Sequence, residues 1–72
     1  MAKNKELKII GLKIRALREA QNVSRAQLAF ELDTTEKQIT RIEYGEVNTG
    51  VMSIVRIAKA LDVEPSVFFE DL

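Results

Sequence analysis

Apolar residues recur at helical spacing near both ends of the chain. In the first third they follow one another at intervals of three and four residues, with charged residues between them: Leu7, Ile10, Ile14 and Leu17. In the last third the same intervals separate Val51, Ile54, Ala58 and Leu61. The two patterns predict amphipathic helices, of which the first ends near Asn22 and the second covers residues 51–62.

Two shorter helices are predicted between these by the residues at which they would begin. Ser24 is followed three positions later by Gln27, and Thr35 is followed at the same distance by Gln38. In such a capping box the hydroxyl accepts a hydrogen bond from the backbone N–H three residues on, and the glutamine accepts one from the N–H of the capping residue. Two capped helices joined by about three residues are typical of a helix-turn-helix, here over residues 24–44.

The remaining residues of this segment suit such a helix pair. Its apolar positions would form the buried sides of the two helices: Leu28, Leu32, Ile39 and Ile42. Ala29 is small where the helices cross, Asp33 tolerates a left-handed backbone in the turn, and Gly45 suits the position after the second helix.

A last short helix is predicted from Pro65, which suits the first position of a helix, and it would pack Phe68 or Phe69 inward. No segment alternates apolar and polar residues as a strand would. The sequence therefore predicts an all-α fold, a compact arrangement of five helices that forms a single domain over residues 1–72.

The charge of the chain is balanced overall but unevenly distributed. Eleven basic side chains face eleven acidic ones, yet residues 1–25 hold seven basic side chains and only two acidic ones. This polarity could present one face to an anion, or it could mean no more than a solvated first helix and an acidic tail. Lys3, Lys5 and Lys8 could likewise form an arm on DNA phosphates, of which residues 1–6 would be flexible, or a disordered terminus that only aids solubility.

Composition also excludes several classes of function. The chain has no Cys and no His, which removes thiolate nucleophiles, imidazole acid–base chemistry and the usual zinc ligands. Its glycines at positions 11, 45 and 50 form no phosphate-binding loop. We therefore expect no enzyme, metal, cofactor or small-molecule ligand. Without a long apolar run or a secretory signal, the expected location is the cytoplasm.

The second helix of the pair carries polar residues at its outward positions: Thr35, Glu36, Lys37, Thr40 and Arg41. Short or forked side chains of these types reach base edges in a major groove. Arg41 and Lys37 suit guanine O6 and N7, and Glu36 could accept from cytosine N4. The alternative is an ordinary solvated face, in which the two cations pair with Glu36 or Glu43.

Four segments, in order, carry a resemblance to a known family: Ile14-Arg-Ala-Leu-Arg18, Ser24-Arg-Ala-Gln-Leu-Ala29, Ile39-Thr-Arg-Ile-Glu43-Tyr-Gly45 and Ile57-Ala-Lys-Ala-Leu61. Over roughly residues 10–69 the chain resembles the phage repressor/Cro-type (XRE) helix-turn-helix family. The resemblance implies a lambda-repressor-like domain, usually dimeric, whose third helix enters the major groove of a roughly palindromic operator in double-stranded DNA.

The same resemblance implies roles for individual residues. The outward positions from Thr35 to Arg41 match those that contact bases, and three further residues match positions that contact phosphates: Arg25, Tyr44 and Asn48. Tyr44 could equally be a packing residue. Arg18 and Glu43 match a pair that bridges the first helix to the end of the third. Many members of the family have basic residues in the loop where this chain has Glu46. The acidic residue here weakens the nonspecific attraction of the protein to DNA.

Four apolar residues fall at partly outward positions of the predicted fourth and fifth helices: Met52, Val55, Val67 and Leu72. They predict a dimer interface, unless the helical phase is one residue off and some belong to the core. The leading hypothesis is therefore a homodimeric DNA-binding regulator, more specifically a repressor or autoregulator. Alternatives are a protein-binding module on the same fold, such as an antitoxin or adaptor, and a structural bundle without partners.

Overall fold

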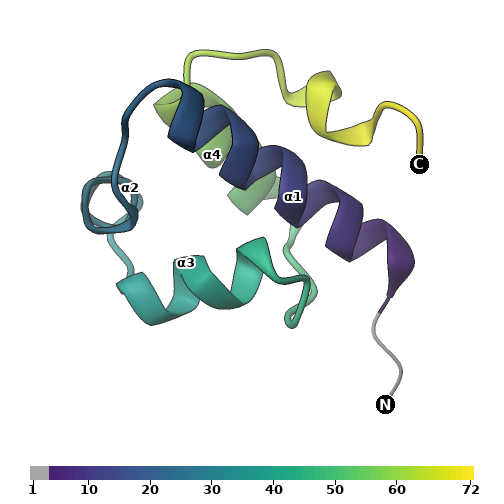
Figure 1. Cartoon of the computed structure of the whole chain (residues 1–72), viewed down its shortest axis with the longest axis horizontal. Coiled ribbons are helices and arrows are strands. Elements are labelled where there is room, and N and C mark those ends of the chain that lie inside the picture. The colour runs from purple at the N-terminus through teal and green to yellow at the C-terminus, as the bar shows by residue number, and fades with distance from the viewer. Residues whose placement is uncertain (1–3) are drawn as a thin grey trace.

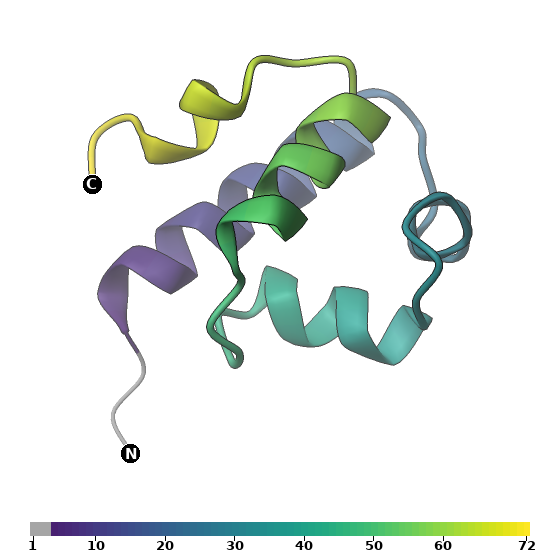
Figure 2. The same ribbon diagram turned by 180° about the vertical axis from the view of Figure 1, so that it is seen from behind.

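The structure, a computed structural model, describes residues 4–72. The regular secondary structure of these residues is helical, and turns and loops connect the helices. Four α helices precede a single 3-10 helix: α1 Lys5–Ala20, α2 Arg25–Glu31, α3 Glu36–Glu43, α4 Val51–Ala60 and η1 Pro65–Phe69. The described residues contain no strand, so the predicted all-α class is confirmed, with a 3-10 helix as the fifth element. Figures 1 and 2 show α1 crossing the middle of the molecule, with α3 on one side and η1 on the other.

One apolar core joins all five elements. Its fully or nearly fully buried members are Ile10, Ile14, Leu28, Ala29, Ile39, Ile42, Ile54, Ile57, Ala58, Leu61 and Phe68. Pro65 stands at the start of η1, as predicted. Within η1, Phe68 is completely buried and Phe69 is 47% exposed. Phe68 is therefore the phenylalanine that packs into the core.

The first helix begins earlier than a flexible arm over residues 1–6 would allow. The Asn4 side chain accepts hydrogen bonds from the N–H groups of Glu6 and Leu7, at 2.8 and 3.3 Å, and Lys5 is already helical. A capping side chain of this kind stabilises the first turn of a helix. Part of the predicted arm is therefore helical, and Lys3 lies outside the described residues.

The two predicted capping boxes differ. At α2 both bonds form, because Ser24 Oγ accepts from Gln27 N at 3.0 Å and Gln27 Oε1 accepts from Ser24 N at 2.8 Å. At α3 only the first bond forms, from Gln38 N to Thr35 Oγ1 at 3.1 Å. The Gln38 side chain instead lines a groove against α4, so the prediction of a second full box was wrong.

Two residues after the end of each of the four α helices stands a residue with left-handed backbone: Asn22, Asp33, Gly45 and Asp62. After α3, Gly45 N donates to Ile42 O and Glu46 N donates to Arg41 O, at 3.0 and 2.9 Å. This Schellman arrangement satisfies the last helical carbonyls. The sequence placed the ends of the first and fourth helices near Asn22 and at residue 62, which are these left-handed residues. In the structure α1 and α4 end two residues earlier, at Ala20 and Ala60.

Within residues 4–72, no helix combines the length and the apolar character needed to cross a lipid bilayer.

Candidate nucleic-acid interface

The outward side of α3 is polar and open to solvent. Its inward residues are Ile39, Ile42 and Glu43, all buried. Of the five residues predicted to contact bases, Thr35, Glu36, Lys37 and Arg41 are exposed and Thr40 is half-buried. The start of α3 and its outward side therefore present four exposed polar side chains to solvent.

The two cations of α3 are directed to solvent without an ionic partner. No acidic side chain in the described part of the chain lies within 4.0 Å of Lys37 or Arg41. The alternative, in which they pair with Glu36 or Glu43, is not what the structure contains, because Glu43 turns inward. Both charges remain available to an anion or to base edges.

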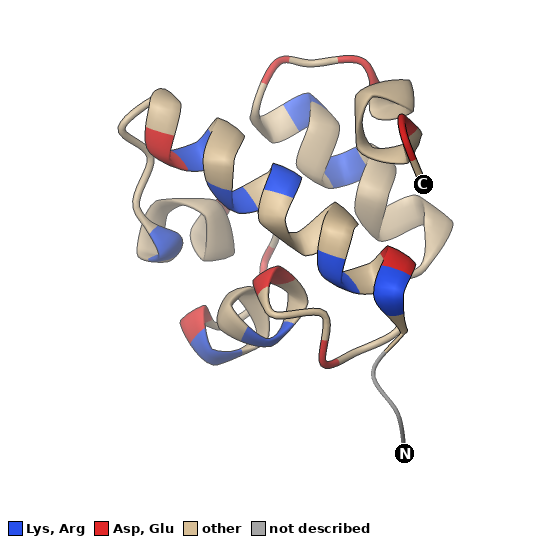
Figure 3. Ribbon diagram, turned by 45° about the vertical axis from the view of Figure 1, so that its right-hand side comes forward, with Lys and Arg blue, Asp and Glu red and all other residues tan. Residues whose placement is uncertain are grey.

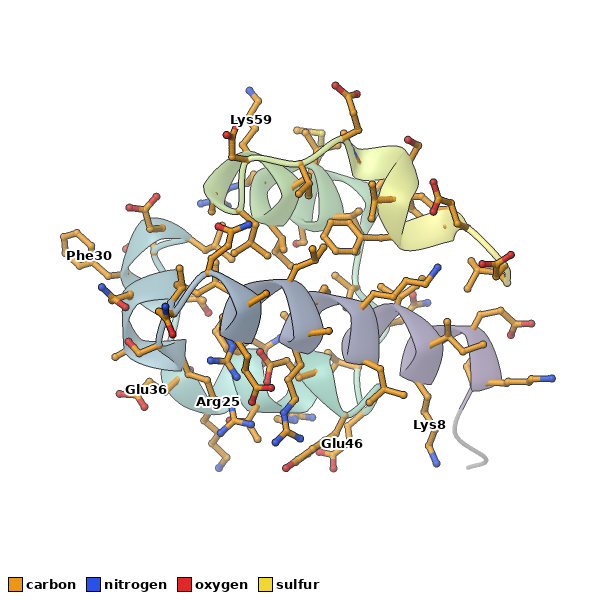
Figure 4. All side chains as sticks on the ribbon, turned by 45° about the horizontal axis from the view of Figure 1, so that its top comes forward. Lys8, Arg25, Phe30, Glu36, Glu46 and Lys59 are labelled. Atoms are coloured by element: carbon orange, nitrogen blue, oxygen red, sulfur yellow. The ribbon has the colours of Figure 1, made fainter. Side chains whose placement is uncertain are left out.

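Residues from other elements lie on the same side of the molecule. Figure 4 places Arg25 and Glu36 along one edge, together with Lys8 and Glu46, and places Lys59 on the opposite side. Among the predicted phosphate contacts, Arg25 is half-buried at the first position of α2, whereas Tyr44 and Asn48 are exposed. Figure 3 shows Lys and Arg along α1 and on α3, and acidic residues in the loop that follows α4.

A buried ion cluster connects α3 to the two helices before it. The Glu43 side chain is fully buried, and its Oε2 accepts from Arg18 Nε at 2.6 Å. Arg18 Nη2 lies 3.3 Å from Glu43 Oε1, and Arg18 Nη1 donates to the Val23 carbonyl at 2.8 Å. The structure thus brings together the two residues predicted as a pair. A buried carboxylate of this kind requires its partners, because leaving it unpaired costs about 3–5 kcal/mol.

Arg25 joins this cluster, which sequence reasoning did not predict. Its Nε donates to Glu43 Oε1 at 3.1 Å, so one carboxylate holds arginines from α1 and α2. A further ion pair on α1 joins Arg15 Nε to Glu19 at 3.1 Å. The hydrogen bond and charge of Glu19 raise the pKa of Arg15, which keeps that guanidinium charged.

Gly11 sets the distance between α1 and α3. A Cβ atom at this position would lie 2.3 Å from the carbonyl oxygen of Glu43 and 2.6 Å from that of Ile42. Only a residue without a side chain lets the backbones approach so closely. The signal in the sequence was a glycine inside an otherwise helical pattern, a residue that such patterns normally avoid.

The four residues predicted for a dimer interface differ in exposure. Met52 and Leu72 are exposed, whereas Val55 and Val67 are half-buried. Val51 and Phe69, which were not predicted, are exposed as well. Apolar surface is therefore available on α4 and around η1.

A helix-turn-helix family model matches residues 14–68, most of the chain. The chain belongs to this family of DNA-binding transcriptional regulators. The family consists of regulators rather than enzymes, which agrees with the prediction from sequence. The match begins within α1 and ends in η1, so it includes both the helix pair and the helices that support it.

Curated relatives support the same assignment. The chain is 42% identical over 62 residues to the uncharacterized HTH-type transcriptional regulator y4wC of Sinorhizobium fredii, covering 86% of this chain and 43% of that protein. It is 40% identical over 58 residues to the control protein C.BamHI of Bacillus amyloliquefaciens, covering 79% of this chain and 72% of that protein. The chain thus spans about half or less of the length of regulators such as y4wC.

Solved structures share the fold over nearly the whole chain. The restriction-modification controller protein C.AhdI from Aeromonas hydrophila superposes with a TM-score of 0.86 at 32% identity, covering 92% of this chain and all of that one. The clp gene regulator ClgR from C. glutamicum reaches the same TM-score at 15% identity, covering 92% of this chain and 86% of that one. The second similarity shows the fold alone.

Proposed function

We propose that the chain is a sequence-specific regulator that binds double-stranded DNA as a homodimer and acts in the cytoplasm as a repressor or autoregulator. Residues 35–44 form the recognition helix and lie in the major groove. The observation that carries this proposal is the outward side of α3, where Lys37 and Arg41 stand exposed and unpaired among residues 4–72.

The assembly we propose pairs two copies through α4 and η1, with Met52 and Leu72 near the centre of the contact. Their exposure supports it, and so does the exposed apolar surface of Val51 and Phe69 beside them. A two-fold related pair places its recognition helices about 34 Å apart, one turn of DNA. Similarity to the controller C.AhdI makes restriction-modification promoters the first natural operators to test.

The test is selection of bound duplexes from a random library at about physiological salt, where nonspecific binding is weak. We expect an enriched inverted repeat whose half-sites are one helical turn apart. Enrichment of a single half-site would contradict the dimer. No enrichment by folded protein would contradict DNA recognition and favour a protein-binding module, for which the exposed Glu46 on the same edge is the supporting observation.

Substitution of Arg41 tests its role at the bases. We expect Arg41→Ala to weaken binding to the selected duplex by about 1–3 kcal/mol and to relax base preference at one position of each half-site. Lys59→Ala is the matched control, because Lys59 is also exposed in the last turn of a helix but lies on the opposite side of the molecule. Equal losses on selected and random duplexes would contradict a base contact by Arg41.

A further inference from the structure

The Arg25 guanidinium is held at one end and free at the other. Its Nε donates to Glu43 Oε1 at 3.1 Å, while neither Nη atom makes a hydrogen bond within residues 4–72. The side chain is 31% exposed and stands on the edge of the molecule that α3 also presents. The free Nη edge therefore lies on the same edge of the molecule as the outward side of α3. The bond at Nε fixes its orientation.

Glu43 is a rigid support for that bond. Its side chain has no exposed surface, and Arg18 holds it through both oxygens, at 2.6 Å from Nε and 3.3 Å from Nη2. Arg18 is itself anchored to the Val23 carbonyl at 2.8 Å. The carboxylate consequently has little freedom to move. Because Arg25 is bonded to it, the Arg25 guanidinium is restricted as well.

The charges of this cluster do not cancel. Arg18 also lies 3.9 Å from Glu19, which pairs with Arg15, so the connected set has three arginines and two glutamates and carries a net charge of +1. Arg18 is buried and faces the carboxylate with two donors, whereas Arg25 reaches the surface. The unbalanced positive charge therefore reaches the surface at Arg25.

We propose that Glu43 is a positioning residue for DNA binding, which holds Arg25 with its free Nη edge toward a backbone phosphate. This inference rests on the proposed function and adds a role for Glu43 beyond its pairing with Arg18. Holding the guanidinium in advance lowers the conformational entropy lost on binding. It also requires arginine at position 25, because one planar group must donate to the carboxylate and to the phosphate at once.

Arg25→Lys tests this requirement, since lysine keeps the charge but has a single donor group. We expect the lysine amine to remain at Glu43, so that Arg25→Lys and Arg25→Ala both weaken binding to selected and random duplexes about tenfold. Both should reduce the slope of log affinity against log salt by about 0.9, the value of one phosphate contact. Arg25→Lys binding like the unsubstituted protein would overturn the proposal.

Arg15→Lys is the matched control. Arg15 also bonds a glutamate through Nε at 3.1 Å, but Glu19 is exposed and can follow a shorter side chain. We expect its affinity and salt slope to stay within about twofold of the unsubstituted protein. A loss equal to that of Arg25→Lys would show a general effect of arginine removal and overturn the specific role.

Two further measurements separate this inference from the proposed function. Glu43→Gln should lower the salt slope as Arg25→Ala does, and the double substitution should add no further loss; additive losses would overturn the proposal.

In the free protein, we expect the Arg25 Nε–H to exchange with solvent more slowly than that of the exposed Arg41, by nuclear magnetic resonance. If no duplex is bound but Arg25 is protected, the proposed function fails; equal exchange rates refute the positioning itself.

Discussion

The contact between α1 and α3 and the contact between α4 and η1 are built differently. Where α1 meets α3, the Gly11 backbone lies against the carbonyls of Ile42 and Glu43, and a buried carboxylate with two arginines stands beside them. Where η1 meets the rest of the molecule, the fully buried Phe68 ring packs into an apolar core. Lys13 adds hydrogen bonds from α1 to the carbonyls of Val67 and Glu70.

The difference concerns which quantity each contact fixes. Two backbones in contact fix a distance, and a charged group with directed hydrogen bonds fixes an orientation. An apolar side chain in a core fixes mainly a volume, which other side chains of similar size can supply. The position of α3 is therefore set by a backbone distance and a buried ion cluster, as the proposed recognition helix requires in order to meet DNA at a defined angle, whereas η1 has an apolar core contact and the hydrogen bonds of Lys13.

The largest effect is expected at the apolar contact. Phe68→Ala should lower the free energy of unfolding by about 3–5 kcal/mol, because it removes a fully buried ring, whereas Phe68→Leu should cost less than about 1.5 kcal/mol. Urea denaturation at one fixed protein concentration measures both. Phe69→Ala, next in the chain but half exposed, should change the value by less than about 1 kcal/mol. Equal losses at positions 68 and 69 would contradict the assignment of the core.

A smaller but more selective effect is expected at the backbone contact. Gly11→Ala should destabilise by about 2 kcal/mol, because overpacking of 1–3 kcal/mol outweighs the gain of up to about 1 kcal/mol in helix propensity. Gly50→Ala is the control, since a Cβ there meets nothing within 4 Å and only the weaker N-cap of α4, worth about 0.5–1 kcal/mol, is lost. A neutral Gly11→Ala would show that α1 and α3 can separate without cost.

The smallest effect is expected at the left-handed residues that follow two of the helices, and it should be equal at both. Asp33 lies two residues after the end of α2, Asp62 lies two residues after the end of α4, and both have left-handed backbone. Replacing either by glycine should raise the free energy of unfolding by about 0.5–1 kcal/mol, because the strain at Cβ disappears. Thermal unfolding at fixed concentration provides the measurement. Stabilisation at only one position would show that tertiary contacts, and not the local backbone, determine these helix ends.

The sequence predicted most of the fold because its helices are marked locally. Apolar intervals identify the buried faces, and residues such as Ser24 and Gly45 mark where helices begin and end. What it could not predict depends on how separate helices meet. The bond from Arg25 to Glu43 spans 18 residues and two helices, and the role of Gly11 exists only once α3 lies against it.

The second capping box shows the same limitation on a smaller scale. Thr35 and Gln38 have the required spacing, but the glutamine lines a pocket together with residues of α4, an element that begins 13 residues further on, and makes no second capping bond. The choice between Phe68 and Phe69 stayed open for a related reason, since a single residue of helical phase decides it. Among the candidate site residues, the exposed side of α3 followed from local pattern and the Arg18–Glu43 pair from the family resemblance, whereas the bond from Arg25 to that pair required the tertiary structure.

The close approach at Gly11 also has an evolutionary consequence. Residues that hold α3 in place and residues that α3 exposes are separate sets, since Ile39, Ile42 and Glu43 face inward and the exposed polar positions do not contribute to the contact with α1. Under the proposed function, a lineage can therefore exchange the outward side chains and acquire new operators while the scaffold beneath them is inherited unchanged. Divergence in target choice then proceeds without divergence in architecture.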